Sequence, residues 1–332
     1  MNSKKIDILN IGLIILSLII AVQLPFKLFL LSYAILGPLH YLTEIHWLNE
    51  QNFFVGSKKN WLLPFIVIAL LLSSAYFILN LLNLGRSVYD LSYSIATNAN
   101  LLILSAFIFS LSLIFIREKK LLIISLMGSI IIATAIGQFT PNLLSFLGFS
   151  LPTIIHVFLF TLCFMVFGSL KNKSKFGFLA ASLLVCIPFV ISYLPINPQN
   201  YNLVQEVSHT YNNSIMINLN IMLAHILGTE YHSLSEIGLK IQIFIAFAYT
   251  YHYINWFSKT SIIGWKRSMK NKNFTLILLI WALSVGIYYY DFNTGLLALL
   301  FLSFLHVFLE FPLNVISIKE ILAFGFKPKN KS

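Results

Sequence analysis

The chain has 332 residues, of which 58% are hydrophobic, 15% aromatic and only 10% charged, and its formal net charge is +11. Soluble domains carry about a quarter charged residues, so this composition excludes a soluble globular enzyme and a disordered chain. The two cysteines lie in apolar runs and do not form a disulfide scaffold. The composition is that of a multi-pass membrane protein, whose basic residues face a lipid bilayer and no nucleic acid.

A bilayer core of about 30 Å is crossed by about 20 apolar helical residues, and this length divides the chain into ten predicted spans. The N-terminal apolar stretch is interpreted as an uncleaved first span, and the short apolar piece 215–227 as a re-entrant or interfacial helix within the outer loop 196–232. The predicted fold is therefore an all-α polytopic bundle, with residues 1–332 as one transmembrane domain. The predicted spans are 6–24, 26–48, 61–83, 97–117, 120–139, 151–170, 177–195, 233–257, 273–291 and 294–316.

The distribution of basic residues gives an orientation for these spans. With the N-terminus inside, 19 of the 22 Lys and Arg residues fall in inner segments, and only Lys27, Arg86 and Lys240 fall outside. Positively charged loops stay on the cytoplasmic side, so this pattern predicts a cell-membrane protein with both termini cytoplasmic.

Few ionisable residues lie within the predicted spans, and such residues usually face the interior of the bundle. In chain order, the second span has His40, Glu44 and His46, the sixth has His156, the eighth has His252 and Asn255, and the tenth has His306 and Glu310. His40 with Glu44 and His306 with Glu310 repeat one His-x-x-x-Glu pattern, which places both side chains of each pair on one helix face.

The predicted topology also brings these residues to similar depths. Glu44, His252 and Glu310 lie four, five and six residues before the cytoplasmic ends of their spans, with His40 and His306 about one turn deeper. His40, Glu44, His252, His306 and Glu310 are therefore the predicted ligands of a metal ion, with iron favoured as Fe(II) and zinc or manganese as alternatives.

Three further residues are secondary candidates for this site. His156 is expected near the outer face, five residues into its span, and His46 lies near the membrane edge beside Trp47. Asn255 shares a helix face with His252 and could orient its imidazole.

The second span, in the sequence GPLHYLTE, resembles the Brp/Blh family of membrane β-carotene dioxygenases, which carry a Gly-x-x-His-x-x-x-Asp element in an early helix. The matching positions are Gly37, His40 and Glu44, with Glu in place of Asp. The resemblance implies an iron site that includes His40, and an oxygenase acting on an apolar isoprenoid, carotenoid or lipid.

Two other functions are compatible with the same residues. A proton-coupled transporter or channel could use Glu44, His252 and Glu310 as a relay, and a structural membrane subunit could use them for polar packing. The sequence indicates no oligomeric state. A closed site with ligands at bonding distance would favour the enzyme, and a polar path to both faces would favour the transporter.

Overall fold

The computed structural model describes residues 3–82, 84–201, 205–259 and 271–326, and these residues form helices and connections without any strand. The chain folds as two compact units, one made of Met1–His40 and Gly168–Gly295, the other of Tyr41–Phe167 and Leu296–Ser332. Three helices continue through the boundary between the units: α3 (Gly37–Glu50), α9 (Thr161–Asn172) and α16 (Phe292–Phe326).

The first unit also contains helices that lie entirely within it. These are α1 (Ser3–Gln23), α2 (Pro25–Leu31), the π-helix η1 (Ser32–Leu36), α10 (Lys175–Tyr193), η5 (Pro198–Asn200), α11 (Gln205–Asn212), α12 (Ile217–Ile226), α13 (Glu236–Ser258) and α15 (Asn271–Tyr290).

The second unit likewise has helices of its own. These are η2 (Asn52–Phe54), η3 (Gly56–Leu62), α4 (Leu63–Leu81), α5 (Arg86–Thr97), α6 (Ala99–Phe115), α7 (Lys119–Phe139), α8 (Pro141–Ser150) and the π-helix η4 (Leu151–Phe160).

Eight helical stretches in the described part of the chain are long and apolar enough to cross a membrane, or nine if the bent pair α5 and α6 is one span. That pair takes the place of the predicted span 97–117 and bends by 52°. The helix at the predicted span 233–257 is α13, which is not one of the eight. The all-helical, membrane-type architecture is thus shown, while the count of ten and the orientation stay predictions. The basic segment 260–270 lies outside the described residues.

Many large apolar side chains are exposed on the surface of these helices. Ile124 and Ile131 on α7 are 63% and 66% exposed, and Leu279 and Leu283 on α15 are 63% and 67% exposed. Large apolar side chains in such numbers are unfavourable in water and are at no disadvantage against lipid tails. The long apolar helices therefore identify a membrane protein.

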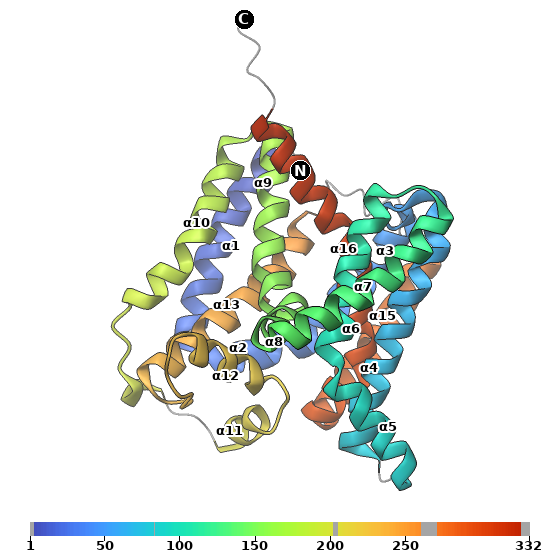
Figure 1. The fold of residues 1–332 in the computed structure, drawn as a ribbon. Coiled ribbons are helices and arrows are strands. Elements are labelled where there is room, and N and C mark those ends of the chain that lie inside the picture. The colour runs from blue at the N-terminus through green and yellow to red at the C-terminus, as the bar shows by residue number, and fades with distance from the viewer. Residues whose placement is uncertain (1–2, 83, 202–204, 260–270, 327–332) are drawn as a thin grey trace, which may run out of the picture. The chain divides into compact units, whose positions relative to one another are not determined.

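In the first unit, α13 is the central helix. It packs against α1, α2, α10 and α12 (Figure 1). Most of its side chains are buried. Tyr211 on α11 links α12 to α13, because its hydroxyl lies 2.5 Å from Asn220 Oδ1 and 2.6 Å from Gln242 Oε1. Gln242 in turn donates to the Pro25 carbonyl at 3.3 Å. A buried hydrogen-bond network of this kind fixes one arrangement of helices, because each polar group would be costly without a partner.

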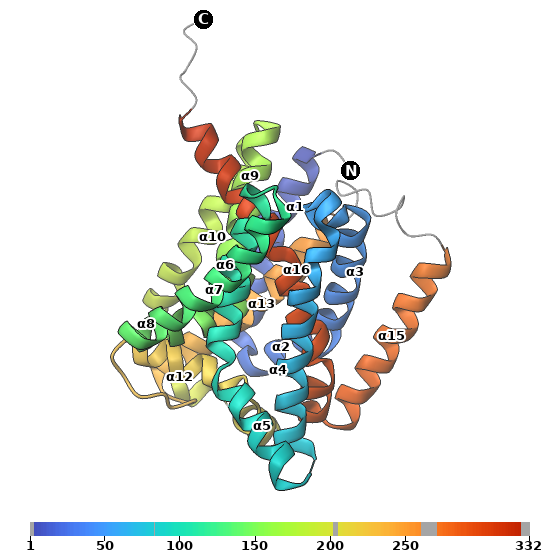
Figure 2. The same cartoon turned by 45° about the vertical axis from the view of Figure 1, so that its right-hand side comes forward.

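In the second unit, α6 is the central helix, and it packs against α4, α7 and α8 (Figure 2). The Phe107 ring on α6 packs edge-to-face on Phe311 of α16, with centroids 5.2 Å apart, and also stacks with Phe160 of η4 at 6.3 Å. These contacts place η4 and α16, which carry His156 and His306, on the same side of α6.

Candidate metal centre

A pair of buried histidines lies in the first unit. His40 Nε2 on α3 and His252 Nε2 on α13 are 3.0 Å apart, and their rings meet edge-to-face with centroids 4.6 Å apart. Tyr253 and Trp256 lie against the His40 ring, with centroids 5.2 and 5.7 Å away. The aromatic rings leave His40 and His252 only 1% and 6% exposed, so this pair is kept from bulk water.

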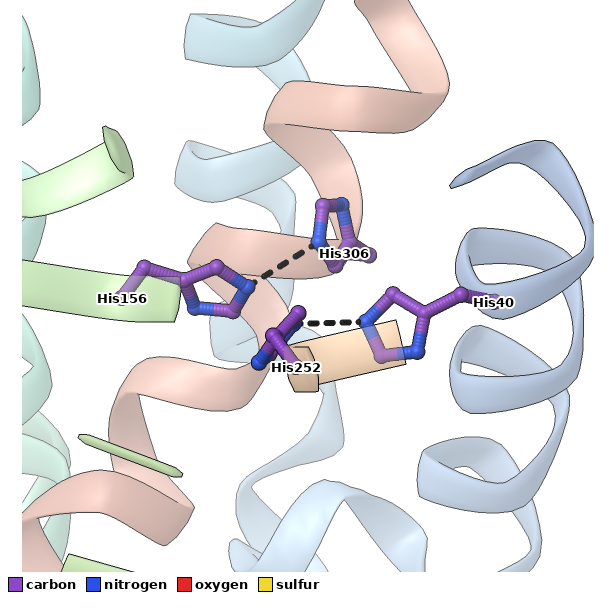
Figure 3. A group of neighbouring side chains, drawn as sticks. All are labelled: His40, His156, His252 and His306. Atoms are coloured by element: carbon purple, nitrogen blue, oxygen red, sulfur yellow. Dashed lines mark hydrogen bonds between the residues drawn. The ribbon is translucent and has the colours of Figure 1, made fainter. Parts of the chain in front are cut away.

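A second histidine pair of the same form lies in the second unit. His156 Nε2 and His306 Nε2 are 3.2 Å apart, with ring centroids 5.0 Å apart in an edge-to-face arrangement. The Tyr41 ring stacks on His306 with centroids 4.2 Å apart. Figure 3 shows both pairs joined through their ring nitrogens.

The second nitrogen of each ring in this unit faces an oxygen. His156 Nδ1 lies 3.5 Å from Glu310 Oε2, and His306 Nδ1 lies 3.3 Å from the Leu302 carbonyl oxygen. Metal-binding histidines usually donate this second N–H to a carboxylate or a carbonyl, which fixes the tautomer and the ring orientation. The Leu302 carbonyl therefore orients the His306 ring, and the Glu310 carboxyl group lies beside His156 Nδ1, with each Nε2 facing the other histidine.

The four histidines together form a buried group in the apolar helical bundle. His40, His156, His252 and His306 each offer a ring nitrogen, and these atoms all lie within 4.8 Å of one another (Figure 3). Four buried histidines in this arrangement could bind a metal ion.

The local helix geometry explains how His156 reaches this group. His156 lies on the π-helix η4, which follows Pro152 and the non-helical backbone angles of Thr153. A π-helical turn shifts the side chains that follow it around the helix axis, and such turns are frequent at functional sites. The other π-helix, η1, directly precedes α3 and lies one turn before His40.

The two predicted carboxylate ligands lie in the second unit and outside the group of four histidines. The Glu44 carboxyl group contacts that of Glu310, and both residues are buried. Glu310 also faces His156, on the ring nitrogen turned away from His306. In this position Glu310 can orient the His156 ring. The four imidazoles are therefore better placed than the two carboxyl groups to bind a metal ion.

The secondary candidates lie in three different settings. His156 is one of the four grouped histidines, whereas half-buried His46 is not in that group. Asn255 is buried on α13, three residues after His252, and its Oδ1 has no hydrogen-bond partner among the described residues.

The helical run that carries His156 does not begin at residue 151, as the predicted span does. It begins at Pro141, after Thr140, and continues to Asn172, so His156 lies near its middle. Thr followed by Pro is a helix-start signal, since proline is well tolerated in the first turn. That signal in the sequence would have moved His156 from near the start of its helical run to the middle of it, while its depth in the bilayer stays a prediction.

The chemistry of the four histidines, and the spacing within each pair, fit a metal ion. A metal bound at about 2.1 Å holds two neighbouring nitrogens about 3.0 Å apart at a right angle and about 3.4 Å apart in a tetrahedron. The two measured Nε2–Nε2 distances, 3.0 and 3.2 Å, lie within this range. The residues present therefore fit the metal that the sequence predicts, without identifying it.

Comparisons with protein-family models, with curated proteins and with solved structures each gave no match for this chain.

Proposed function

We propose that this protein is a membrane metalloenzyme that binds its metal ion through His40, His156, His252 and His306. The observation that carries this proposal is the close approach of the Nε2 atoms of His156 and His306. His306 Nδ1 lies 3.3 Å from the Leu302 carbonyl oxygen and His156 Nδ1 lies 3.5 Å from Glu310 Oε2, so hydrogen on both Nδ1 atoms would leave two Nε2 lone pairs facing each other at 3.2 Å. Two lone pairs so close repel each other unless a cation lies between them. The two imidazoles of the first unit also approach through their Nε2 atoms, which are 3.0 Å apart.

The reaction that we propose is oxidation of an apolar isoprenoid, carotenoid or lipid by a non-haem iron site. The four neutral imidazoles would hold Fe(II), and when bound the ion would supply the chemistry of dioxygen activation. The resemblance of Gly37, His40 and Glu44 to the membrane dioxygenase element supports iron over zinc or manganese.

The chain's own residues would have three tasks in such a reaction. The four histidines bind, Glu310 and the Leu302 carbonyl hold two of the rings in the binding tautomer, and aromatic rings exclude water. Exclusion of water prevents side reactions of a reactive site. An apolar substrate dissolved in the bilayer would reach such a site without crossing water.

For localisation, we propose the cell membrane with both termini in the cytoplasm, on the strength of the basic segments. The partners are then the lipid bilayer and an apolar small molecule.

The experiment that tests the metal site is elemental mass spectrometry on protein purified in mild detergent, before and after loading with Fe(II) or Zn(II). We expect at least one bound ion per chain, lost in both His252→Ala and His306→Ala, which change one pair each. His232→Ala, a change at an exposed loop histidine, is the matched control and should retain the ion. Size-exclusion profiles show whether the variants remain folded.

Absence of metal from the folded wild-type protein, with loading also negative, would refute the metalloenzyme. The proton-coupled transporter, with Glu44, His252 and Glu310 as its relay, would then be the favoured alternative. For the reaction itself, the iron-loaded protein is supplied with a carotenoid in lipid vesicles and oxygen uptake is recorded. Uptake that depends on both the carotenoid and His306 is expected, and no uptake with any polyene or unsaturated lipid would contradict the oxygenase.

A further inference from the structure

The second unit contains a buried acidic pair next to the histidines. Glu44 on α3 and Glu310 on α16 are 2% and 1% exposed, and their carboxyl groups are in contact. Glu310 contacts His156 as well, at 3.5 Å. One carboxyl group thus adjoins both a predicted metal ligand and a second carboxyl group.

Among the described residues, no fixed positive charge lies against Glu310. The polar groups next to its carboxyl group are His156, Glu44 and Asn314, and none of them is permanently cationic. Two carboxylates in contact cannot both remain ionised in an apolar interior without a cation. Either a proton or a metal ion must therefore compensate their charge.

Asn314 gives an independent indication of which cation binds. It is fully buried one turn after Glu310 on α16, so both side chains lie on one face of that helix. Its amide lies beside Glu310, yet neither its oxygen nor its nitrogen makes a hydrogen bond of good geometry among the described residues. A shared proton needs only the two carboxyl groups and leaves the amide oxygen without a role, whereas a metal ion would take that oxygen as a ligand.

We propose that Glu44, Glu310 and Asn314 form a second cation site of oxygen ligands, with Glu310 shared between this site and the histidine centre. Carboxylate and amide oxygens suit a hard divalent ion such as Mn²⁺ or Fe²⁺ and not the softer ions that prefer nitrogen. Paired sites with shared carboxylates are a recurrent way of building two-metal centres in helix bundles. The inference rests on the proposed function and extends it from one metal ion to two.

The test uses the different preferences of the two sites. The detergent-purified protein is first loaded with one equivalent of Zn²⁺, which nitrogen ligands hold far more tightly than Mn²⁺. Mn²⁺ is then titrated, and the loss of the free-ion electron paramagnetic resonance signal measures its binding. We expect one Mn²⁺ per zinc-loaded chain, no Mn²⁺ binding in Glu44→Gln, and more than tenfold weaker binding in Asn314→Ala.

Two controls separate this inference from the proposed function. Glu44→Gln should still bind its zinc, because Glu44 is not one of the four histidine ligands. Ser110→Ala removes another buried polar side chain of the second unit, one that bonds only its own helix, and should bind Mn²⁺ like the wild type. Zinc binding without Mn²⁺ binding would overturn the second site alone and assign a shared proton to the pair. Failure to bind zinc at all would instead refute the histidine centre.

Discussion

Replacement of Glu310 by Gln distinguishes a residue that orients a histidine from one that binds the metal directly. The sequence predicts Glu310 as a ligand, whereas the structure places its Oε2 3.5 Å from His156 Nδ1. Gln retains the shape and an oxygen acceptor but loses the charge. Hydrogen bonds to charged groups contribute about 1.5–3 kcal/mol and neutral ones about 0.5–1.5 kcal/mol. The loss is therefore about 1–1.5 kcal/mol, or roughly a tenfold weaker affinity for the ion at the histidines.

The two roles predict clearly different magnitudes. A structural zinc ion binds with about 10–16 kcal/mol over four ligands, so the loss of one ligand costs about 2.5–4 kcal/mol, roughly a hundredfold or more. Zinc affinity is measured by competition with a chromophoric chelator at neutral pH. Glu236→Gln, which alters an exposed pair with Lys240, is the control and should leave the affinity unchanged. A hundredfold loss in Glu310→Gln would show that Glu310 is a ligand, and an unchanged affinity would show that it does not act on His156 at all.

Two further changes test the packing behind the site. Tyr41→Leu removes the ring stacked on His306 and should weaken zinc binding by about 2–10-fold, since such ring pairs contribute about 0.5–1.5 kcal/mol, while Tyr41→Phe should have little effect; equal losses in both variants would exclude stacking as the cause. Gly148→Ala would place a Cβ atom 2.4 Å from Asn100 Cβ and 2.5 Å from its Cα, so α8 and α6 must separate, at a cost of about 1–3 kcal/mol or more. A lower melting temperature in detergent is expected, whereas Gly128→Ala, with nothing within 4 Å, should stabilise α7 by up to about 1 kcal/mol. Equal melting temperatures of the two glycine variants would contradict this packing.

The sequence allowed the helices to be predicted wherever apolar length alone determines them. A run such as 120–139 has no other stable form in a bilayer, because every backbone polar group must be satisfied within the helix, and α7 covers Lys119–Phe139. Breaks and extensions were harder to predict. The bend at Asn98 and the start of α8 at Pro141 depend on capping and tertiary contacts, which an average over about 20 residues does not register. The boundaries between the two units fall inside α3, α9 and α16. The amino-acid composition does not change at these boundaries, so the sequence does not predict them.

For the site, depth and helical spacing pointed to His40, His252 and His306, because an ionisable residue in an apolar span usually faces the interior of the helix bundle. The same spacing was less informative about the carboxylates. His-x-x-x-Glu places Glu310 on the same face as His306, but α16 meets η4 there, and the carboxyl group faces His156 instead. Spacing along one helix cannot show which neighbouring helix a side chain meets. The repeated motif therefore marks the neighbourhood of the site while assigning its acidic members a role that only the Glu310→Gln measurement can decide.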